Sequence, residues 1–154
     1  MSSRKRLALL VLVVSCAASL GAGRAAAASR NHPKVEAPVG VRAVEFARHL
    51  LGVRYTWGGT SPRTGFDCSG FVRYVYARFG ISLPHSSYAD FDLGRRVARL
   101  KPGDLVFFHG LGHVGLYVGH GKFIHAPHSG THVSYSTLAA YRGSYDGARR
   151  IAHA

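Results

Sequence analysis

The sequence predicts an α+β fold in which helices come first and pack on a central antiparallel β-sheet. Apolar residues recur at helical spacing in two segments, residues 41–51 and 68–79. After residue 100 the pattern changes to strand-like segments of apolar residues separated by glycine-containing turns. Helices do not alternate with strands along the chain, so a parallel βαβ architecture is not expected.

The composition is that of one ordinary globular domain. The chain has 154 residues, of which 47% are hydrophobic and 11% aromatic. A chain of this composition can bury a core, which excludes an intrinsically disordered or low-complexity protein. Its two cysteines are too few for a disulfide scaffold and do not form a C-x-x-C pair.

Residues 1–28 have the parts of a secretory signal peptide. Basic residues 4–6 precede an apolar run at residues 7–14, and the small residues up to Ala28 contain Ala-x-Ala cleavage sites. A lipoprotein signal that ends before Cys16 is the alternative, because Val-Val-Ser-Cys resembles a lipobox. A retained N-terminal anchor is a third interpretation. We therefore expect an exported protein, periplasmic or extracellular, that contacts a membrane only if Cys16 carries a lipid.

Basic residues outnumber acidic ones. The chain has 20 Lys and Arg against 7 Asp and Glu, and cleavage near Ala28 would leave 16 against 7, a net charge of +9. Such a charge favours a polyanionic partner, and for an exported protein we predict the anionic cell envelope. Nucleic acid is not an expected partner, because no predicted helix carries a basic stripe interleaved with aromatic residues.

The residues after the predicted signal peptide form a linker and then the first helix. Residues 29–38 contain two prolines and no periodicity, so we interpret them as a linker and residues 39–154 as one domain. Gly52 is placed to end the helix predicted at residues 41–51. The apolar residues of that helix fall on one face, namely Ala43, Val44, Ala47, Leu50 and Leu51.

Cys68 is predicted to lie at the N-terminus of the second helix. A glycine-rich turn at residues 58–59 leads to Asp67, which is a good N-cap residue. Helical spacing continues to Phe79, and Gly80 ends the pattern. Free backbone N–H groups and the helix dipole lower the pKa of a thiol at such a position. These features make Cys68 a candidate nucleophile.

The rest of the chain is predicted to form loops and strands. A loop with a short helix covers residues 83–93, and a turn at 101–104 precedes a strand at 105–108. Two further strand-like segments, 113–118 and 122–126, are separated by Gly-His-Gly and predict a β-hairpin.

The hairpin brings two histidines together. If Val118 pairs with Lys122, Gly115 lies opposite His125, and His113 is a diagonal neighbour of His125 on the same face. Gly115 would leave space beside the two imidazoles. A register shift by one residue would put them on opposite faces. A nucleophilic cysteine needs an imidazole as its base and a third group that orients this base, so the pair is a candidate partner for Cys68.

Zinc binding is the rival chemistry for these side chains. Cys68 with His109, His113, His125 and His128 offers enough ligands for a zinc site. The segment between His109 and His113 is not helical, however, and no H-E-x-x-H motif is present. We therefore predict no metal and no other cofactor. We expect the loop histidines, His109, His120, His128 and His132, to be ordinary loop residues.

Six blocks of the sequence, spread over residues 41–140, resemble the NlpC-type cell-wall endopeptidases. They are Tyr55-x-Trp57-Gly58-Gly59, Phe66 to Val72, Leu83-Pro84-x-Ser86, Pro102 to Phe108, His113 to Gly119, and Phe123 to Ala126. The resemblance implies a papain-like fold, in which the helix that bears the cysteine packs on the sheet that bears the histidines.

The resemblance also implies a role for each matching residue. Cys68 matches the nucleophile, His113 the general base and His125 the residue that orients this base. Tyr55 matches a tyrosine whose hydroxyl lies by the oxyanion site, where the Cys68 backbone N–H would also donate. Asp67 and Ser69 match positions that face the peptide stem of the substrate.

Relatives of this type cleave the bond between D-γ-glutamate and the following diamino acid in peptidoglycan, and we expect a monomeric enzyme that acts on such stem peptides. A non-catalytic envelope-binding protein and an amidase or acyltransferase on the same fold are the alternatives. His85 departs from the family pattern, because many relatives have Arg at this position. For Trp57 we expect core packing, whereas Tyr55 fits a core role and a site role equally well.

Overall fold

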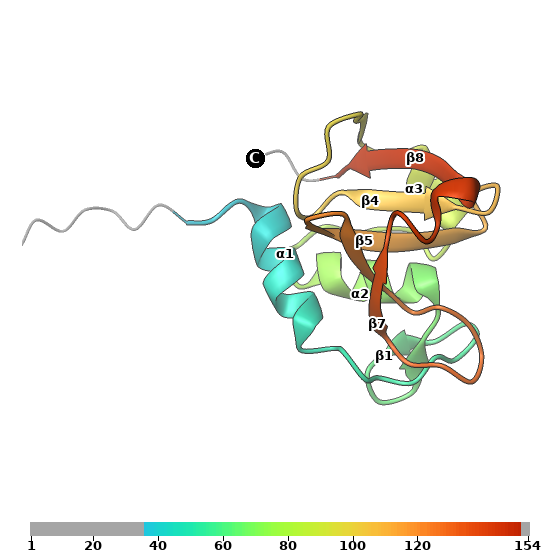
Figure 1. Ribbon diagram of the computed structural model, residues 1–154. Coiled ribbons are helices and arrows are strands. Elements are labelled where there is room, and N and C mark those ends of the chain that lie inside the picture. Colours follow the sequence, from blue (N-terminus) through green and yellow to red (C-terminus); the bar gives the residue numbers. More distant parts are fainter. Residues whose placement is uncertain (1–35, 152–154) are drawn as a thin grey trace, which may run out of the picture. The chain divides into compact units, whose positions relative to one another are not determined.

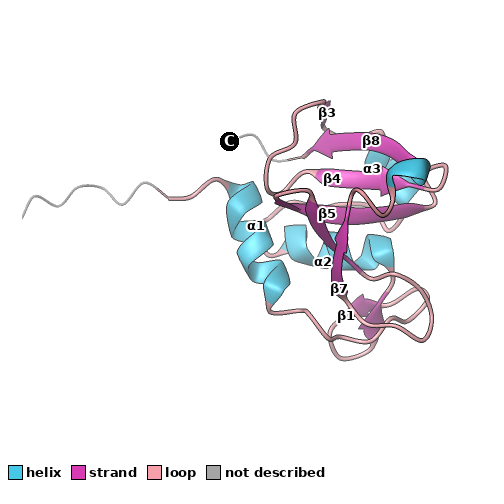
Figure 2. Ribbon diagram, in the orientation of Figure 1, coloured by secondary structure: helices cyan, strands magenta, loops and turns pink. Residues whose placement is uncertain are grey.

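The computed structural model describes residues 36–151. Figures 1 and 2 show helices packed against an antiparallel sheet, which confirms the predicted α+β fold. The signal peptide and the lipobox predicted within residues 1–28 lie outside the described residues. No helix in the described range is long and apolar enough to cross a bilayer.

A six-stranded sheet forms the centre of the described domain, with the strand order β3-β8-β4-β5-β6-β7. The helices are α1 (Val39–Arg48), α2 (Cys68–Ala77) and α3 (Ser87–Phe91), with a 3₁₀ helix at Arg142–Ser144. The sheet strands are β3 (Arg95–Arg96), β4 (Leu105–Phe108), β5 (His113–Gly119), β6 (Lys122–His125), β7 (Ser134–Thr137) and β8 (Tyr145–Arg150). A separate small ribbon consists of β1 (Thr60–Ser61) and β2 (Gly65–Phe66).

Apolar side chains cover both faces of the sheet. On one face, α1 and α2 pack against β4, β5 and β6 and form the larger hydrophobic core. The smaller core on the other face is closed by residues from the segments 97–100 and 138–141. The alternation within β4 shows how one strand serves both cores, because Leu105 and Phe107 belong to the helix side and Val106 and Phe108 to the other side.

The first helix begins and ends earlier than predicted. It starts at Val39 and stops at Arg48, and the next residues form tight turns in which Leu50 N donates to Ala47 O and Leu51 N to Arg48 O. These i→i+3 hydrogen bonds overwind the chain and rotate Leu51 away from the core. Leu51 is therefore 37% exposed, which corrects its predicted place on the buried face. Gly52 follows with a φ of 82° and ends the turn.

The hairpin of β5 and β6 has the predicted strands but a shorter turn. Leu116 pairs with Ile124, so His125 comes level with Gly115 as predicted. Lys122 pairs with Gly119 rather than Val118, because a bulge shifts the register near the turn. The turn itself consists of His120 and Gly121, which both have positive φ values, the geometry of a two-residue hairpin turn.

The space predicted beside Gly115 is filled. A Cβ atom at Gly115 would lie 2.6 Å from the ring of Phe123, so glycine is needed for this ring to lie across the strand. The Phe123 ring in turn packs on the imidazole of His125, with ring centroids 4.7 Å apart. Gly115 therefore allows Phe123 to support His125 and does not leave a cavity.

Strand β8 lies inside the sheet, between β3 and β4, and local sequence patterns did not predict it. Of its six residues only Ala148 is buried, so an apolar pattern is missing. An ion pair holds its end instead, because the Arg150 guanidinium donates two hydrogen bonds of 2.7 Å to the buried carboxylate of Asp104. The turn before β4 is thereby tied to the C-terminal strand.

We predict that Asp90, a fully buried carboxyl in α3, makes the stability pH-dependent. Neither of its oxygens has a hydrogen-bond partner within residues 36–151, and burial raises its pKa to about 7. The folded state then binds more protons than the unfolded state between about pH 4 and pH 7, so the free energy of unfolding falls as the pH rises through that window. The loss is at most about 4 kcal/mol at three pKa units.

Urea denaturation of the protein and of Asp90→Asn between pH 4.5 and pH 8 measures this effect. The histidines titrate in both proteins, so the difference between the two isolates Asp90. The wild type should lose stability relative to Asp90→Asn as the pH rises. A difference that stays constant with pH would show that Asp90 titrates normally.

Candidate active site

Cys68 lies in an open cleft with a volume of about 550 Å³. Several separate chain segments line this cleft, and they supply Tyr55, Cys68, Ser69, His85, His113 and His128 among others. Another cavity, of about 590 Å³, is formed by residues of α1 and β5 to β7 and contains no cysteine. We place the candidate active site in the first cleft because it holds the candidate nucleophile Cys68 together with the imidazole of His113.

The N-terminus of α2 positions Cys68, but burial dominates its chemistry. Burial raises the pKa of the thiol, and the negative charge of Asp67 raises it further. The backbone N–H groups of Val114, Ser69 and Cys68 lower the pKa, but not enough to compensate. The helix N-terminus therefore does not give Cys68 the lowered pKa that the sequence led us to expect, because burial outweighs it.

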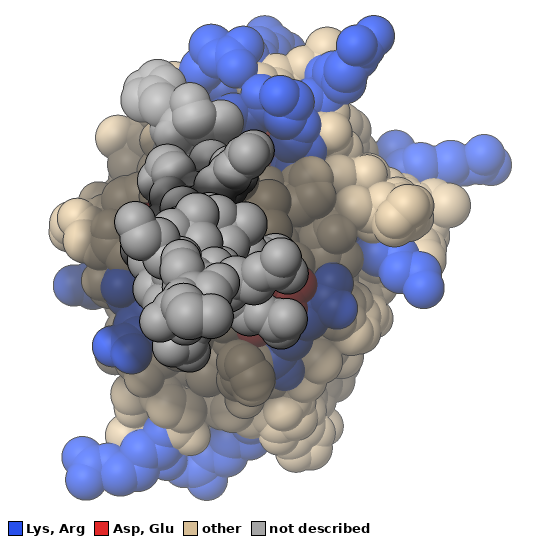
Figure 3. Space-filling model, turned by 90° about the vertical axis from the view of Figure 1, so that its left-hand side faces the viewer, with Lys and Arg blue, Asp and Glu red and all other residues tan. Residues whose placement is uncertain are grey.

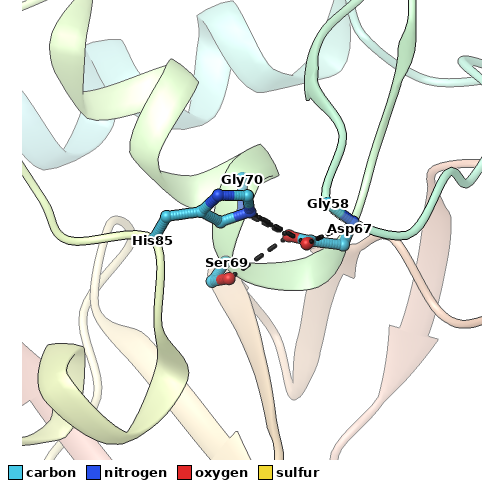
Figure 4. Close-up of polar contacts among 5 residues, drawn as sticks. All are labelled: Gly58, Asp67, Ser69, Gly70 and His85. Carbon is cyan, nitrogen blue, oxygen red and sulfur yellow. Dashed lines mark hydrogen bonds and ion pairs between the residues drawn. The ribbon is translucent and has the colours of Figure 1, made fainter.

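Asp67 is the N-cap of α2 and connects three segments of the site (Figure 4). Its Oδ1 accepts hydrogen bonds from Gly70 N at 2.7 Å and from Ser69 Oγ at 3.2 Å. Its Oδ2 accepts from Gly58 N at 2.9 Å. The Nε2 atom of His85 lies 2.9 and 2.8 Å from the two oxygens. Both carboxylate oxygens are thus engaged by the protein itself.

Close backbone packing explains the glycines beside Asp67. A Cβ atom at Gly70 would lie only 2.0 Å from Gly59 O, so any larger residue would push α2 away from the turn at residues 58–59. Asp67 N donates to the same Gly59 oxygen at 3.1 Å. The predicted glycine-rich turn is therefore a support for the start of α2.

His113 and His125 are direct neighbours. The Nε2 atom of His113 lies 2.7 Å from Nδ1 of His125, and Nε2 of His125 lies 2.9 Å from Ser136 Oγ. This leaves Nδ1 as the ring nitrogen of His113 without a side-chain partner among residues 36–151, and it is the nitrogen that could act as a base. Sequence reasoning missed Ser136, because its contact depends on the register of β7 against β6, and the sequence did not predict β7.

These contacts permit one consistent set of tautomers. If Nδ1 of His113 is the base, its Nε2 carries the hydrogen and donates to Nδ1 of His125. His125 must then carry its own hydrogen on Nε2, which donates to the Ser136 hydroxyl oxygen. The hydroxyl of Ser136 can accept this hydrogen, so it satisfies Nε2 in the tautomer of His125 that accepts from His113.

Both imidazoles are neutral at ordinary pH. Burial lowers the pKa of His113, and the charges of His109 and His128 lower it further. Burial also lowers the pKa of His125, to which His113 and His128 contribute. His109 and His128, which we expected to be ordinary loop residues, both line the cleft.

The aromatic residues differ in their placement. Tyr55 packs against the larger core and also lines the cleft, so it combines the two roles that its sequence context allowed. Burial, followed by the charges of Cys68 and Asp67, raises its pKa. Trp57 is 85% exposed, which makes the prediction of core packing wrong. It sits at a tight turn closed by the Gly59 N to Thr56 O hydrogen bond and projects into water.

Ser69 is buried and lines the cleft, with its hydroxyl bonded to Asp67. Contact of Ser69 and Asp67 with a peptide stem stays a prediction. Within residues 36–151, no three His, Cys, Asp or Glu side chains are grouped closely enough to hold a metal ion.

A family model described as the NlpC/P60 family matches residues 52–150. The chain belongs to the NlpC/P60 family. This confirms the resemblance drawn from the six sequence blocks.

Relatives in this family are named for peptide-bond hydrolysis. The chain is 51% identical over 97 residues to a probable endopeptidase p60 from Listeria innocua, covering 60% of this chain and 20% of the relative. It is 39% identical over 120 residues to a gamma-DL-glutamyl hydrolase from Bacillus subtilis, covering 72% of this chain and 29% of the relative. The chain thus spans less than a third of the length of either relative.

A solved structure shares the fold. The peptidoglycan hydrolase RipB from Mycobacterium tuberculosis superposes with a TM-score of 0.65 at 36% sequence identity, covering 75% of this chain and 67% of that chain. The NlpC/P60 fold therefore extends over most of the described residues.

We predict that Ser136→Ala weakens catalysis without unfolding the protein. Loss of the hydroxyl leaves Nε2 of His125 without its acceptor, and both tautomers of His125 become populated. We expect kcat to fall by about five- to tenfold, which corresponds to one hydrogen bond of about 1 kcal/mol or slightly more, with KM nearly constant. Nitrogen NMR of labelled histidine should show more of the tautomer that carries hydrogen on Nδ1.

Two variants serve as controls for this prediction. Ser136→Thr keeps a hydroxyl and should restore most of the rate. Ser134→Ala removes a hydroxyl from the same strand and should leave the tautomer of His125 unchanged. An unaltered NMR spectrum and rate for Ser136→Ala would contradict the role of Ser136.

Proposed function

We propose that this domain is a cysteine peptidase that hydrolyses the stem peptides of peptidoglycan, with Cys68 as the nucleophile. The observation that carries the proposal is the shared cleft of Cys68 and His113, backed by the hydrogen-bonded chain to His125 and Ser136. Membership in a family with relatives named endopeptidase and peptidoglycan hydrolase supports the same reaction class.

The reaction starts from a neutral thiol and a neutral imidazole. As the sulfur of Cys68 attacks the substrate carbonyl, its proton passes to Nδ1 of His113. The imidazolium that forms keeps its Nε2–H bond to His125, which remains neutral and orients it. His113 then protonates the leaving amine, and water hydrolyses the thioester to release the enzyme.

The oxyanion of the tetrahedral intermediate needs hydrogen-bond donors. We assign this role to the backbone N–H of Cys68 and the hydroxyl of Tyr55, which stays protonated because its pKa is raised. For the scissile bond we propose the D-γ-glutamyl bond to the diamino acid, and the name of the B. subtilis relative favours this choice.

The location follows from the proposed substrate. Peptidoglycan is outside the cytoplasm, so we propose export through the signal at residues 1–28 and work in the periplasm or outside the cell. Three of the seven acidic residues, Asp67, Asp90 and Asp104, are buried. On the face shown in Figure 3, Lys and Arg side chains cover several areas, and little acidic surface is visible. Such a surface favours attraction to an anionic envelope.

Mass spectrometry of muropeptides incubated with reduced protein tests the proposed function. We expect new fragments that end in D-glutamate and fragments that start with the diamino acid, and none with Cys68→Ala. No cleavage, together with salt-sensitive binding of Cys68→Ala to sacculi, would instead support a non-catalytic envelope-binding protein. Cleavage at another bond would assign the activity and correct the bond.

We predict an acidic limb of the pH–rate profile below the usual imidazole range of about 6.5. Because the pKa of His113 is lowered, its basic form persists as the pH falls, and activity is lost only when His113 becomes protonated. The thiol behaves in the opposite way, since its raised pKa makes it slow to react with iodoacetamide near pH 7.

Two measurements check this prediction. The profile of kcat/KM against pH gives the acidic limb, and the rate of alkylation of Cys68 against pH gives the pKa of the thiol. Rapid alkylation at pH 6 would mean that Cys68 and His113 already form an ion pair, and the mechanism would start from a thiolate.

A further inference from the structure

Two exposed aromatic side chains line the cleft of Cys68. Trp57 is 85% exposed and Tyr88 is 59% exposed, and both belong to the cleft lining. Large aromatic side chains are buried in most proteins, because water around the ring is unfavourable. Two other exposed tyrosines, Tyr135 and Tyr145, do not line this cleft. The exposure of Trp57 and Tyr88 therefore concentrates an apolar surface at the candidate active site.

Hydrogen bonds to Asp67 fix both segments relative to Cys68. Gly58 N, next to Trp57, donates to Oδ2 of Asp67. His85, three residues before Tyr88, contacts both oxygens of the same carboxylate. The backbone segments that carry the two rings are thus held in place. A ligand that stacks on these rings therefore costs little conformational entropy of the protein.

We propose that Trp57 and Tyr88 form a saccharide subsite, which holds the amino-sugar ring that carries the stem peptide. This inference rests on the proposed function. One face of a pyranose ring presents C–H groups and stacks on an aromatic ring, while its hydroxyl and acetamido groups need polar partners. The same cleft offers such partners in His109, His128 and Ser86.

The reach of the substrate agrees with this position. In a stem peptide the D-γ-glutamyl residue is the second residue from the sugar. One α-linked residue spans at most about 3.6 Å and the γ-linked residue is longer by two carbon–carbon bonds, so a peptide with its scissile carbonyl at Cys68 places the sugar on the order of 10 Å away, at the wall of the same cleft.

The charges of the cleft favour a peptide that is still attached to the sugar. A stem peptide without the sugar has a free α-ammonium group and needs an acidic partner. Asp67 is the only acidic residue that lines the cleft, and its oxygens already accept hydrogen bonds from Gly58, Ser69 and Gly70 and contact His85. An amide-linked N-terminus carries no charge and avoids this cost.

Trp57 is the only tryptophan of the chain, so its fluorescence reports directly on the subsite. The full chain carrying Cys68→Ala is titrated with a disaccharide-peptide, with the same peptide lacking the sugars, and with an N-acetylglucosamine tetramer. We expect the disaccharide-peptide and the tetramer to shift or quench the emission and the free peptide to leave it unchanged. No response to either saccharide, or an equal response to the free peptide, would overturn the subsite.

Kinetics provide the second measurement, as the ratio of kcat/KM for the disaccharide-peptide to kcat/KM for the free peptide. We expect Trp57→Ala to lower this ratio by about three- to tenfold and Trp57→Phe to retain most of it. Tyr135→Ala, a matched exposed aromatic outside the cleft, should keep the wild-type ratio. An unchanged ratio in Trp57→Ala would overturn the inference.

The two proposals fail in distinguishable ways. If no substrate is cleaved, the proposed peptidase activity fails, while the fluorescence titration of Cys68→Ala still decides the subsite. If both substrates are cleaved at equal rates by the wild type, the peptidase activity stands and the saccharide subsite is overturned.

Discussion

The carboxylate of Asp67 is the contact on which the candidate site depends. It caps α2, holds the turn that carries Trp57 and contacts His85 before α3, so it fixes three segments that are far apart in sequence. A buried carboxylate is costly unless its oxygens are satisfied, and here the protein supplies those partners. The Asp-Cys-Ser-Gly block is therefore a structural unit, in which the Asp67 cap and the close-packed Gly70 together hold Cys68 at the start of α2.

Burial also controls the charge of the site, because it raises the pKa of an acid and lowers the pKa of a base. It raises the pKa of the Cys68 thiol and lowers the pKa of His113. Both effects favour neutral groups in the resting protein. A protonated thiol is slow to oxidise, so Cys68, the one cysteine within residues 36–151, is protected until a substrate carbonyl is in place.

Much of the fold and of the site could be predicted from local patterns. The helix that begins at Cys68 and the hairpin that brings His113 next to His125 follow from residue spacing, so the sequence was sufficient for them. Strand β8 escaped prediction because an ion pair and backbone pairing hold it, rather than an apolar pattern. The place of Ser136 and the pKa of Cys68 depend on tertiary packing, which spacing alone does not encode.

The position of Ser136 has a consequence for how the protein loses function. Ser136 lies on β7, one of the two edge strands of the sheet, which pairs with β6 alone. Edge strands open at a smaller free-energy cost than central strands, and such local opening does not require the core to unfold. Heat or denaturant should therefore detach the last member of the His113–His125–Ser136 chain first, so that inactivation precedes global unfolding and reverses when β7 re-pairs.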